Sequence, residues 1–355
     1  MTGEVPPLHP QWLEVANTIG SRPSVSHEDV AESRTHFFET FAALATLRVE
    51  PDEVESVKTK DIQIQGKLHA RIFTPPKSGV EPFTNQILPV GLYIHSGGWY
   101  TGSVDAEDFL CRHIALHSQI ILISPEYRLA PENPFPAGLE DCLKTYEFIH
   151  HHAAKFGGNP CQKFIMGGSA GGNLAAAVGL KYASDLELRP AGIIAACMTS
   201  CDPSAMPPVY KERYFPEKYL DTPMINSSSV QLARSEFIPS LLTFIALKMT
   251  LTWHGAEWLQ PPVPGHPLYS PLLHPYIKLL PQIYITAMTN DPSYPETVFF
   301  YEECKKQGVE ADFVEWSGFP HFFWIVPGLE KSHEFMDLWN EKLRGMITKS
   351  VDKKK

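Results

Sequence analysis

The chain has 355 residues, 43% of them hydrophobic, which is enough to bury a large core in one big domain with an insertion or in two domains. Its formal net charge is −10 and no basic run is interleaved with aromatic residues, so nucleic acid is excluded as an expected partner. The six cysteines lack CxxC spacing, which indicates reduced, mostly buried thiols rather than a disulfide framework or a zinc site: Cys111, Cys142, Cys161, Cys197, Cys201 and Cys304.

Neither a targeting nor a membrane segment is expected. The N-terminal residues contain no basic stretch followed by an apolar one, so a signal peptide is not predicted. The most apolar long stretch, 237–247, is interrupted by Lys248 well short of the length of a bilayer span. We therefore expect a cytoplasmic protein without a stable membrane anchor.

The first third of the chain begins with helical patterning. Residues 1–50 look helical and amphipathic, notably 27–47, for which Ser26 is a plausible cap. Residues 54–73 alternate as two strands around a turn near Gly66, which predicts an antiparallel pair at a sheet edge. Residues 75–89 are expected to form a loop.

From residue 90 onward strands and helices alternate, which predicts a largely parallel sheet covered by helices on both faces. The expected strands lie at 90–94, 120–124, 164–166, 191–198, 282–287 and 311–315. The expected helices lie at 105–118, 137–155, 295–307 and 328–346.

This alternation breaks at residues 203–270. The segment is rich in proline and aromatic residues and shows only a partly helical pattern, so we interpret it as an insertion that forms a lid. Its aromatic side chains are equally compatible with the core of that lid and with binding of an apolar acyl or ring system.

The stretch FIMGGSAGGN, residues 164–173, combines an apolar strand, a Gly-x-Ser-x-Gly turn and the start of a helix. This is the layout of a nucleophile elbow, in which Gly167 and Gly171 leave room for a strained Ser169. The following helix N-terminus would favour developing negative charge near the serine hydroxyl. The alternative is an ordinary glycine-rich turn whose serine caps the helix.

A serine nucleophile needs a base that takes its proton and an acid that orients the base. His321 follows the last predicted strand and fits the base, and Asp291 follows the preceding strand and fits the acid. Asp202, which follows the strand after the elbow, is a rival acid. Taken singly, a loop histidine and an Asp-Pro turn are common surface features.

Residues 95–99 read His-Ser-Gly-Gly-Trp directly after a strand. Side-chain-free Gly97 and Gly98 would let a carbonyl oxygen approach their backbone N–H groups, and Ala170 after the nucleophile would supply a further donor. These three residues are the predicted oxyanion hole, against the alternative of an ordinary glycine turn. His95 is expected to anchor this loop.

These motifs together resemble the hormone-sensitive-lipase-like branch of the α/β-hydrolases. That family carries His-Gly-Gly-Gly-Trp/Phe, Asp-Tyr-Arg-Leu-Ala-Pro-Glu, Gly-Asp-Ser-Ala-Gly-Gly-Asn, Asp-Pro-Leu-Arg-Asp and a late Gly-x-x-His. The corresponding runs here occur in the same order: His95 to Trp99, Glu126 to Glu132, Gly167 to Asn173, Asp291-Pro292 and Gly318 to His321. The sequence departs from the family at Ser96, Gly168 and Ser293 to Pro295.

The resemblance implies an α/β-hydrolase fold, with a mostly parallel central sheet flanked by helices. It implies Ser169, Asp291 and His321 as the triad, and Gly97, Gly98 and Ala170 as the oxyanion hole. The family builds a helical cap from its N-terminal segment and an insertion, which matches 1–50 and 203–270 and leaves 51–202 and 271–355 as the hydrolase core. No metal or organic cofactor is implied.

The expected function is hydrolysis of a carboxylic ester of small to medium apolar acyl or aryl type, through an acyl-enzyme. The expected partner is therefore a small-molecule ester, and a homodimer is left open. One alternative keeps the chemistry and changes the substrate: an acyltransferase, a lactonase or a thioesterase acting on a metabolic intermediate. A second alternative is a non-catalytic small-molecule receptor, which the presence of His321 disfavours.

Overall fold

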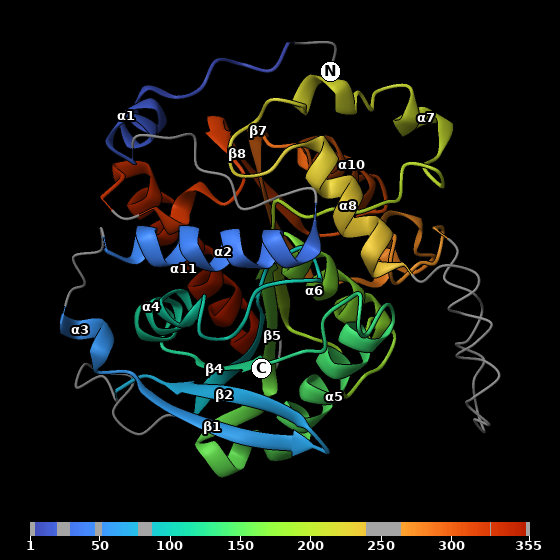
Figure 1. Cartoon of the computed structure of the whole chain (residues 1–355). Helices are drawn as coiled ribbons and strands as arrows, with labels where there is room; N and C mark the ends of the chain where they lie inside the picture. The colour runs from blue at the N-terminus through green and yellow to red at the C-terminus, as the bar shows by residue number, and fades with distance from the viewer. Residues whose placement is uncertain are drawn as a thin grey trace.

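An eight-stranded sheet forms the centre of the computed structural model, with the strand order β1-β2-β4-β3-β5-β6-β7-β8 (Figure 1). The structure describes residues 4–19, 29–46, 52–76, 87–238, 264–326 and 328–352. β1 (Lys58–Gln65) and β2 (Leu68–Thr74) form an antiparallel edge, and Gly66 takes the positive φ of 59° in their turn. β2 is also antiparallel to β4. The other six strands run parallel: β3 (Leu88–Ile94), β4 (Ile121–Pro125), β5 (Gly158–Gly168), β6 (Gly192–Ala196), β7 (Gln282–Asn290) and β8 (Ala311–Pro320).

Helices cover both faces of the parallel strands, as the alternating pattern predicts. α5 (Ala137–His152), α6 (Ala170–Lys181) and α10 (Tyr294–Lys306) contribute to one apolar cluster, and α4 (Asp108–Ser118) and α11 (Glu330–Asp352) contribute to the other. Successive strand residues divide between the two clusters, because their side chains point to opposite faces. Ile165 belongs to the first cluster and Met166 to the second. The central strands are therefore apolar throughout, which identifies them as buried on both faces.

Several element boundaries differ from the sequence prediction. β8 continues to Pro320, five residues beyond the expected end, so that it delivers His321 directly from the sheet. Val54 lies in the short helix α3 (Asp52–Glu55) and not in a strand, and its side chain is buried. α4 begins at Asp108, after a turn in which the Ser103 hydroxyl accepts the N–H of Ala106.

The described part of the N-terminal segment contains two helices, α1 (Pro10–Ile19) and α2 (Val30–Thr46). The carboxylate of Asp29 accepts the N–H groups of Ala31 and Glu32 at 2.8 and 3.2 Å, which satisfies two donors of the first turn of α2. The expected cap, Ser26, lies outside the described residues, as does most of the predicted loop at 75–89.

The insertion after β6 contains three helices in its described part: α7 (Pro208–Lys211), η2 (Pro216–Tyr219) and α8 (Ser227–Phe237). α8 begins with a capping box formed by Asn226 and Ser229. Residues 239–263 lie outside the described residues, and with them several of the aromatic side chains of the predicted lid.

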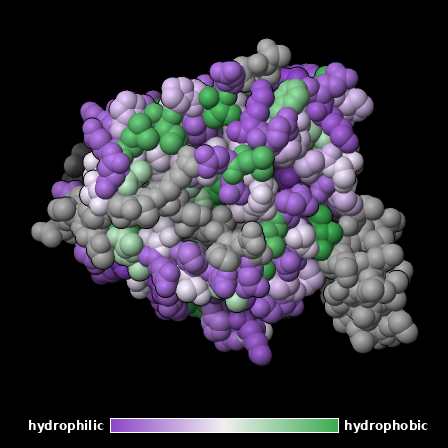
Figure 2. Space-filling view, turned by 45° about the horizontal axis from the view of Figure 1, so that its top comes forward, coloured by the Kyte–Doolittle hydropathy of each residue, from purple (hydrophilic) through white to green (hydrophobic). Residues whose placement is uncertain are grey.

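Hydrophilic side chains predominate on the face drawn in Figure 2, with hydrophobic ones in separate patches between them. Within the described ranges, no helix combines the length and the apolar character that crossing a bilayer requires. The cysteines carry free thiols; Cys161 is exposed and the other five are buried.

Candidate functional site

The candidate site lies at the carboxyl ends of the parallel strands. In the strand order β4-β3-β5-β6, the chain passes from β3 to β4 toward one edge of the sheet and from β5 to β6 toward the other edge. Such a switch point opens a crevice in an α/β sheet, where ligands commonly bind. The loop after β3, the turn after β5 and the residues that follow β7 and β8 all meet there: residues 95–101, Ser169, Asp291 and His321.

Ser169 occupies the turn between β5 and α6 in a strained conformation, with φ 57° and ψ −126°. A non-glycine residue rarely adopts a positive φ, and the strain persists only where the surroundings hold it. Here the Ser169 N–H donates to the Ala196 carbonyl of the next strand at 2.9 Å. A Cβ at Gly171 would collide with the Ile94 carbonyl oxygen, so glycine at this position lets α6 pack against β3. The local signal read from the sequence therefore has a steric basis.

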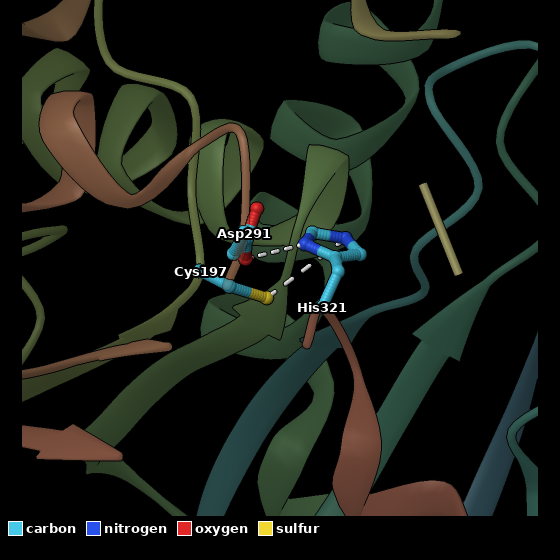
Figure 3. A group of neighbouring side chains, drawn as sticks. All are labelled: Cys197, Asp291 and His321. Carbon is cyan, nitrogen blue, oxygen red and sulfur yellow. Dashed lines mark hydrogen bonds and ion pairs between the residues drawn. The ribbon is translucent and has the colours of Figure 1, made fainter. Parts of the chain in front are cut away.

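Asp291 and His321 form a buried pair at the ends of adjacent strands (Figure 3). His321 Nδ1 lies 2.7 Å from Asp291 Oδ2, and the two residues are 4% and 0% exposed. The other carboxylate oxygen, Oδ1, accepts the backbone N–H and the hydroxyl of Ser293, both at 2.7 Å. With Nδ1 bonded to the acid, the ring can present Nε2 to a proton donor.

The rival acid Asp202 does not take part in this arrangement. Its Oδ1 accepts the backbone N–H and hydroxyl of Ser204 at 2.9 and 2.6 Å, and its Oδ2 accepts the Tyr269 hydroxyl at 3.3 Å. The structure thus brings Asp291, and not Asp202, to the histidine.

Ser169 and His321 line one cleft together with Gly97, Gly98 and Ala170. The cleft has an empty volume of about 680 Å³, its open mouth included. Five of the six predicted site residues therefore share one surface, and the sixth, Asp291, lies behind His321.

The residues 95–101, which we call the glycine loop, turn sharply at the cleft. Gly97, Gly98 and Trp99 all have positive φ, at 115°, 59° and 65°. The N–H groups of Tyr100 and Thr101 both donate to the Gly97 carbonyl, at 3.2 and 2.9 Å, which closes the turn. Ala170 is the first residue of α6, so its N–H has no partner within the helix and is available to a ligand.

His95 anchors the base of the glycine loop, as predicted. Its ring is fully buried, stacks on Tyr127 with ring centres 4.1 Å apart, and lies 2.8 Å through Nδ1 from the Ser96 carbonyl oxygen. Burial lowers the pKa of His95 to about 4, so the ring is neutral at pH 7 and Nδ1 donates this bond.

The departure from the family motif at Ser96 is explained by a buried acid that the sequence analysis missed. The carboxylate of Glu107 accepts the Ser96 N–H at 2.8 Å, the Ser96 hydroxyl, and the Tyr93 hydroxyl at 2.6 Å. Burial raises the pKa of Glu107, and these hydrogen bonds oppose that rise. A glycine at position 96 would leave the acid with one donor fewer.

The departure from the family motif at Gly168 is likewise explained by a neighbouring side chain, that of Phe322. A Cβ at this position would lie 2.7 Å from the Phe322 ring, which fills the space a side chain would need. Phe322 follows His321 with φ 60° and lines the cleft. The other cleft walls come from α2 and from the insertion, through apolar side chains that include Phe37, Phe41, Met224, Ile225, Val230 and Ala233.

Among the residues that the structure describes, Cys197 is the group near the pair that could suggest a metal centre. Its Sγ lies 4.0 Å from His321 Nε2, and one ligand atom each from Cys197, Asp291 and His321 lies within 4.8 Å of the others (Figure 3). Both oxygens of Asp291 are already engaged, by His321 and by Ser293. Burial raises the pKa of the Cys197 thiol well above its usual value, which disfavours the thiolate that a metal requires. The cluster therefore fits an acid–base pair better than a metal site.

The supporting residues of the site were not identified from the sequence. Glu107 and Ser293 contact the glycine loop and the acid respectively, and Phe322 forms a wall. Of these, Ser293 carries a local signal, because an aspartate commonly accepts the N–H two residues later in a turn. Glu107 lies eleven residues from its partner and has no such signal.

A family model described as the alpha/beta hydrolase fold matches residues 91–325. Versiconal hemiacetal acetate esterases are among the relatives. The one from Aspergillus parasiticus is 28% identical over 90% of this chain and 92% of its own length. The one from Dothistroma septosporum is 28% identical over 70% of this chain and 71% of its own length. Among solved structures, vibralactone cyclase superposes with a TM-score of 0.81 at 23% identity, over 99% of this chain and 98% of that chain.

The matched residues include the glycine loop, Ser169, Asp291 and His321, and they cover most of the parallel sheet. The expected resemblance to the hormone-sensitive-lipase-like branch is thereby confirmed. The chain belongs to the α/β hydrolase fold family.

Proposed function

We propose that the protein is a carboxylic-ester hydrolase that uses Ser169, His321 and Asp291 as a triad. The observation that carries this proposal is the strained Ser169 on the same cleft as a histidine whose Nδ1 is 2.7 Å from a buried carboxylate. Esterases among the relatives support the same reaction class.

In this mechanism the Ser169 hydroxyl attacks the ester carbonyl while His321 Nε2 takes its proton. Asp291 holds the ring through Nδ1 and stabilises the imidazolium that forms. The N–H groups of Gly97, Gly98 and Ala170 stabilise the negative oxygen of the tetrahedral intermediate. His321 then protonates the leaving alcohol, which yields the acyl-enzyme, and a water activated by the same ring releases the acid.

The cleft favours small to medium apolar acyl or aryl esters. Its walls include the aromatic side chains of Phe37, Phe41 and Phe322 and aliphatic side chains of the insertion. Two relatives are named for an acetate ester, which supports a short acyl group as the first choice. We further propose that α2 and the insertion act as a two-part cap over the hydrolase core, since both contribute cleft walls.

Hydrolysis of p-nitrophenyl acetate and of longer homologues tests the proposal. The wild-type protein should turn over these esters and be labelled by a fluorophosphonate. Ser169→Ala should lose both properties, with kcat reduced by about 10⁴-fold or more. Ser235→Ala is the matched control, because it removes an exposed serine hydroxyl of α8. Equal turnover by Ser169→Ala and the control would end the proposal.

The same acyl-enzyme can be discharged by an acceptor other than water. The mostly apolar cleft walls favour retention of an organic acceptor, which keeps acyl transfer, lactone opening or thioester hydrolysis as the second candidate. Product analysis in the presence of alcohols and amines separates the two. Release of free acid alone, with no transfer product and no activity on lactones or thioesters, dismisses the second candidate.

A further inference from the structure

Arg34 lies on α2, outside the cleft, and reaches from this helix to the backbone of the glycine loop and of Ala130. Its Nε donates to the Tyr100 carbonyl at 2.7 Å and its Nη2 to the Ala130 carbonyl at 2.8 Å. Both terminal nitrogens also bind the Glu132 carboxylate, at 2.8 and 2.7 Å. A planar guanidinium can satisfy several acceptors in fixed directions at once, which a lysine cannot do.

One of the two carbonyls that Arg34 binds, that of Tyr100, lies in the glycine loop, and the other, that of Ala130, lies in a segment bonded to the loop. The Ala130 N–H donates to the Trp99 carbonyl at 3.0 Å, and the Tyr100 N–H donates to Gly97. Arg34 therefore closes a ring of contacts around the three successive residues with positive φ. A strained turn of this kind keeps its shape only when its neighbours determine it.

The same helix also shapes the cleft. Phe37 and Phe41 lie three and seven residues after Arg34, on the face of α2 that lines the cleft. Ser33, the preceding residue, shares a side-chain hydrogen bond with Tyr100. The position of α2 and the position of the glycine loop are thus set by one group of contacts.

We propose that Arg34 is a positioning residue for the hydrolysis, which couples the docking of α2 to the geometry of the N–H groups of Gly97 and Gly98. This inference rests on the proposed function, because it assigns those donors to the tetrahedral intermediate. By this inference, the N-terminal segment positions the oxyanion donors in addition to covering the cleft.

Arg34→Ala tests the coupling. Complete loss of one oxyanion donor costs about 10²–10³ in kcat. A displaced loop keeps its donors in poorer geometry, so we expect kcat to fall about tenfold. The inhibition constant of a trifluoromethyl ketone, which forms a tetrahedral adduct on the serine, should rise by a similar factor. Added guanidinium ion should restore part of the kcat of Arg34→Ala.

Arg213→Ala is the matched control. Arg213 in the insertion forms a comparable fork to Glu302 of α10, with two contacts of 2.7 Å, and is not among the residues that line the cleft. This variant should keep the wild-type kcat and inhibition constant. Circular dichroism and the thermal midpoint establish that each variant is folded. If Arg34→Ala is unstable, Arg34→Lys keeps the charge and the aliphatic stem and should still lower kcat.

The outcomes separate the inference from the proposed function. An active wild type with an unchanged kcat and inhibition constant in folded Arg34→Ala overturns the role of Arg34 and leaves the esterase intact. A rise in KM alone also overturns it, because Arg34 would then shape only the cleft wall. A wild type that neither turns over esters nor reacts with a fluorophosphonate overturns the proposed function itself.

Discussion

At the scale of single residues, the geometry of the candidate site depends on side chains that orient its functional groups through hydrogen bonds. Ser293 holds the carboxylate of Asp291 through two hydrogen bonds, on the oxygen that His321 leaves free. Its hydroxyl also lies 2.9 Å from the Cys197 carbonyl oxygen at the end of β6. Ser293, the first residue that departs from the family motif after Asp-Pro, therefore positions the Asp291 carboxylate.

We predict that Ser293→Ala lowers kcat about tenfold while the protein stays folded. A hydrogen bond to a charged group is worth about 1.5–3 kcal/mol, and its loss lets the carboxylate turn away from His321. Steady-state kinetics on p-nitrophenyl acetate measures the effect. Ser204→Ala is the control, because it removes a serine hydroxyl 2.6 Å from Asp202, which does not contact the histidine. A kcat equal to that of the control would show that Ser293 does not orient the acid.

At the scale of elements, α8 is joined to the core by a buried ion pair. Arg234 Nη2 lies 2.5 Å from Glu296 Oε1 of α10, with the two residues 3% and 0% exposed. Glu296 also accepts the N–H groups of Ser200 and Cys201, at 2.9 and 3.1 Å. The pair seats α8 so that Phe237 stacks on Trp99 of the glycine loop, with ring centres 4.6 Å apart.

We predict that Arg234→Met destabilises the protein by about 3–5 kcal/mol, because it leaves the Glu296 carboxylate buried without its counter-charge. The free energy of unfolding in urea gives the measurement. Arg213→Met is the control: Arg213 binds Glu302 with two contacts of 2.7 Å, and both partners are partly exposed. Its loss should cost no more than about 1 kcal/mol. Similar losses in the two variants would contradict the assigned role of the buried pair.

At the scale of the whole molecule, one buried and one partly buried histidine make stability sensitive to acid. Burial lowers the pKa of His95 to about 4 and that of His113 on α4 to about 3, from 6.5. The unfolded chain binds protons at these residues before the folded protein does. The stability that these two neutral histidines contribute is therefore fully present above pH 6.5. It is lost as the pH falls toward their pKa values in the folded protein.

We predict that the free energy of unfolding falls by several kcal/mol between pH 6.5 and 4. His95 alone accounts for about 3 kcal/mol at 1.36 kcal/mol per pH unit. Urea titrations at pH 7, 5.5 and 4 measure this loss. His113→Phe should flatten the dependence, whereas His151→Phe, at an exposed position of α5, should leave it unchanged. An identical pH dependence in the wild type and His113→Phe would contradict the prediction.

The sequence by itself determined the features that depend on neighbours along the chain. The alternation of apolar runs predicts the parallel sheet because the side-chain period of a strand is local. The glycines around Ser169 predict the elbow because a strained turn excludes side chains within a few residues. The position of His321 after a strand could also be predicted, because the pattern of a strand is local. β8 nevertheless runs five residues further than its pattern indicated.

Only the tertiary structure decided which distant groups meet. Asp202 and Asp291 both follow strands, and the choice between them depends on β7 lying beside β8, which places Asp291 next to His321. The contacts of Glu107 with Ser96, and of Arg34 with Tyr100 of the glycine loop, join residues 11 and 66 positions apart. Pairings of this kind leave no periodic or local signal, because they arise only when packing brings separate elements together.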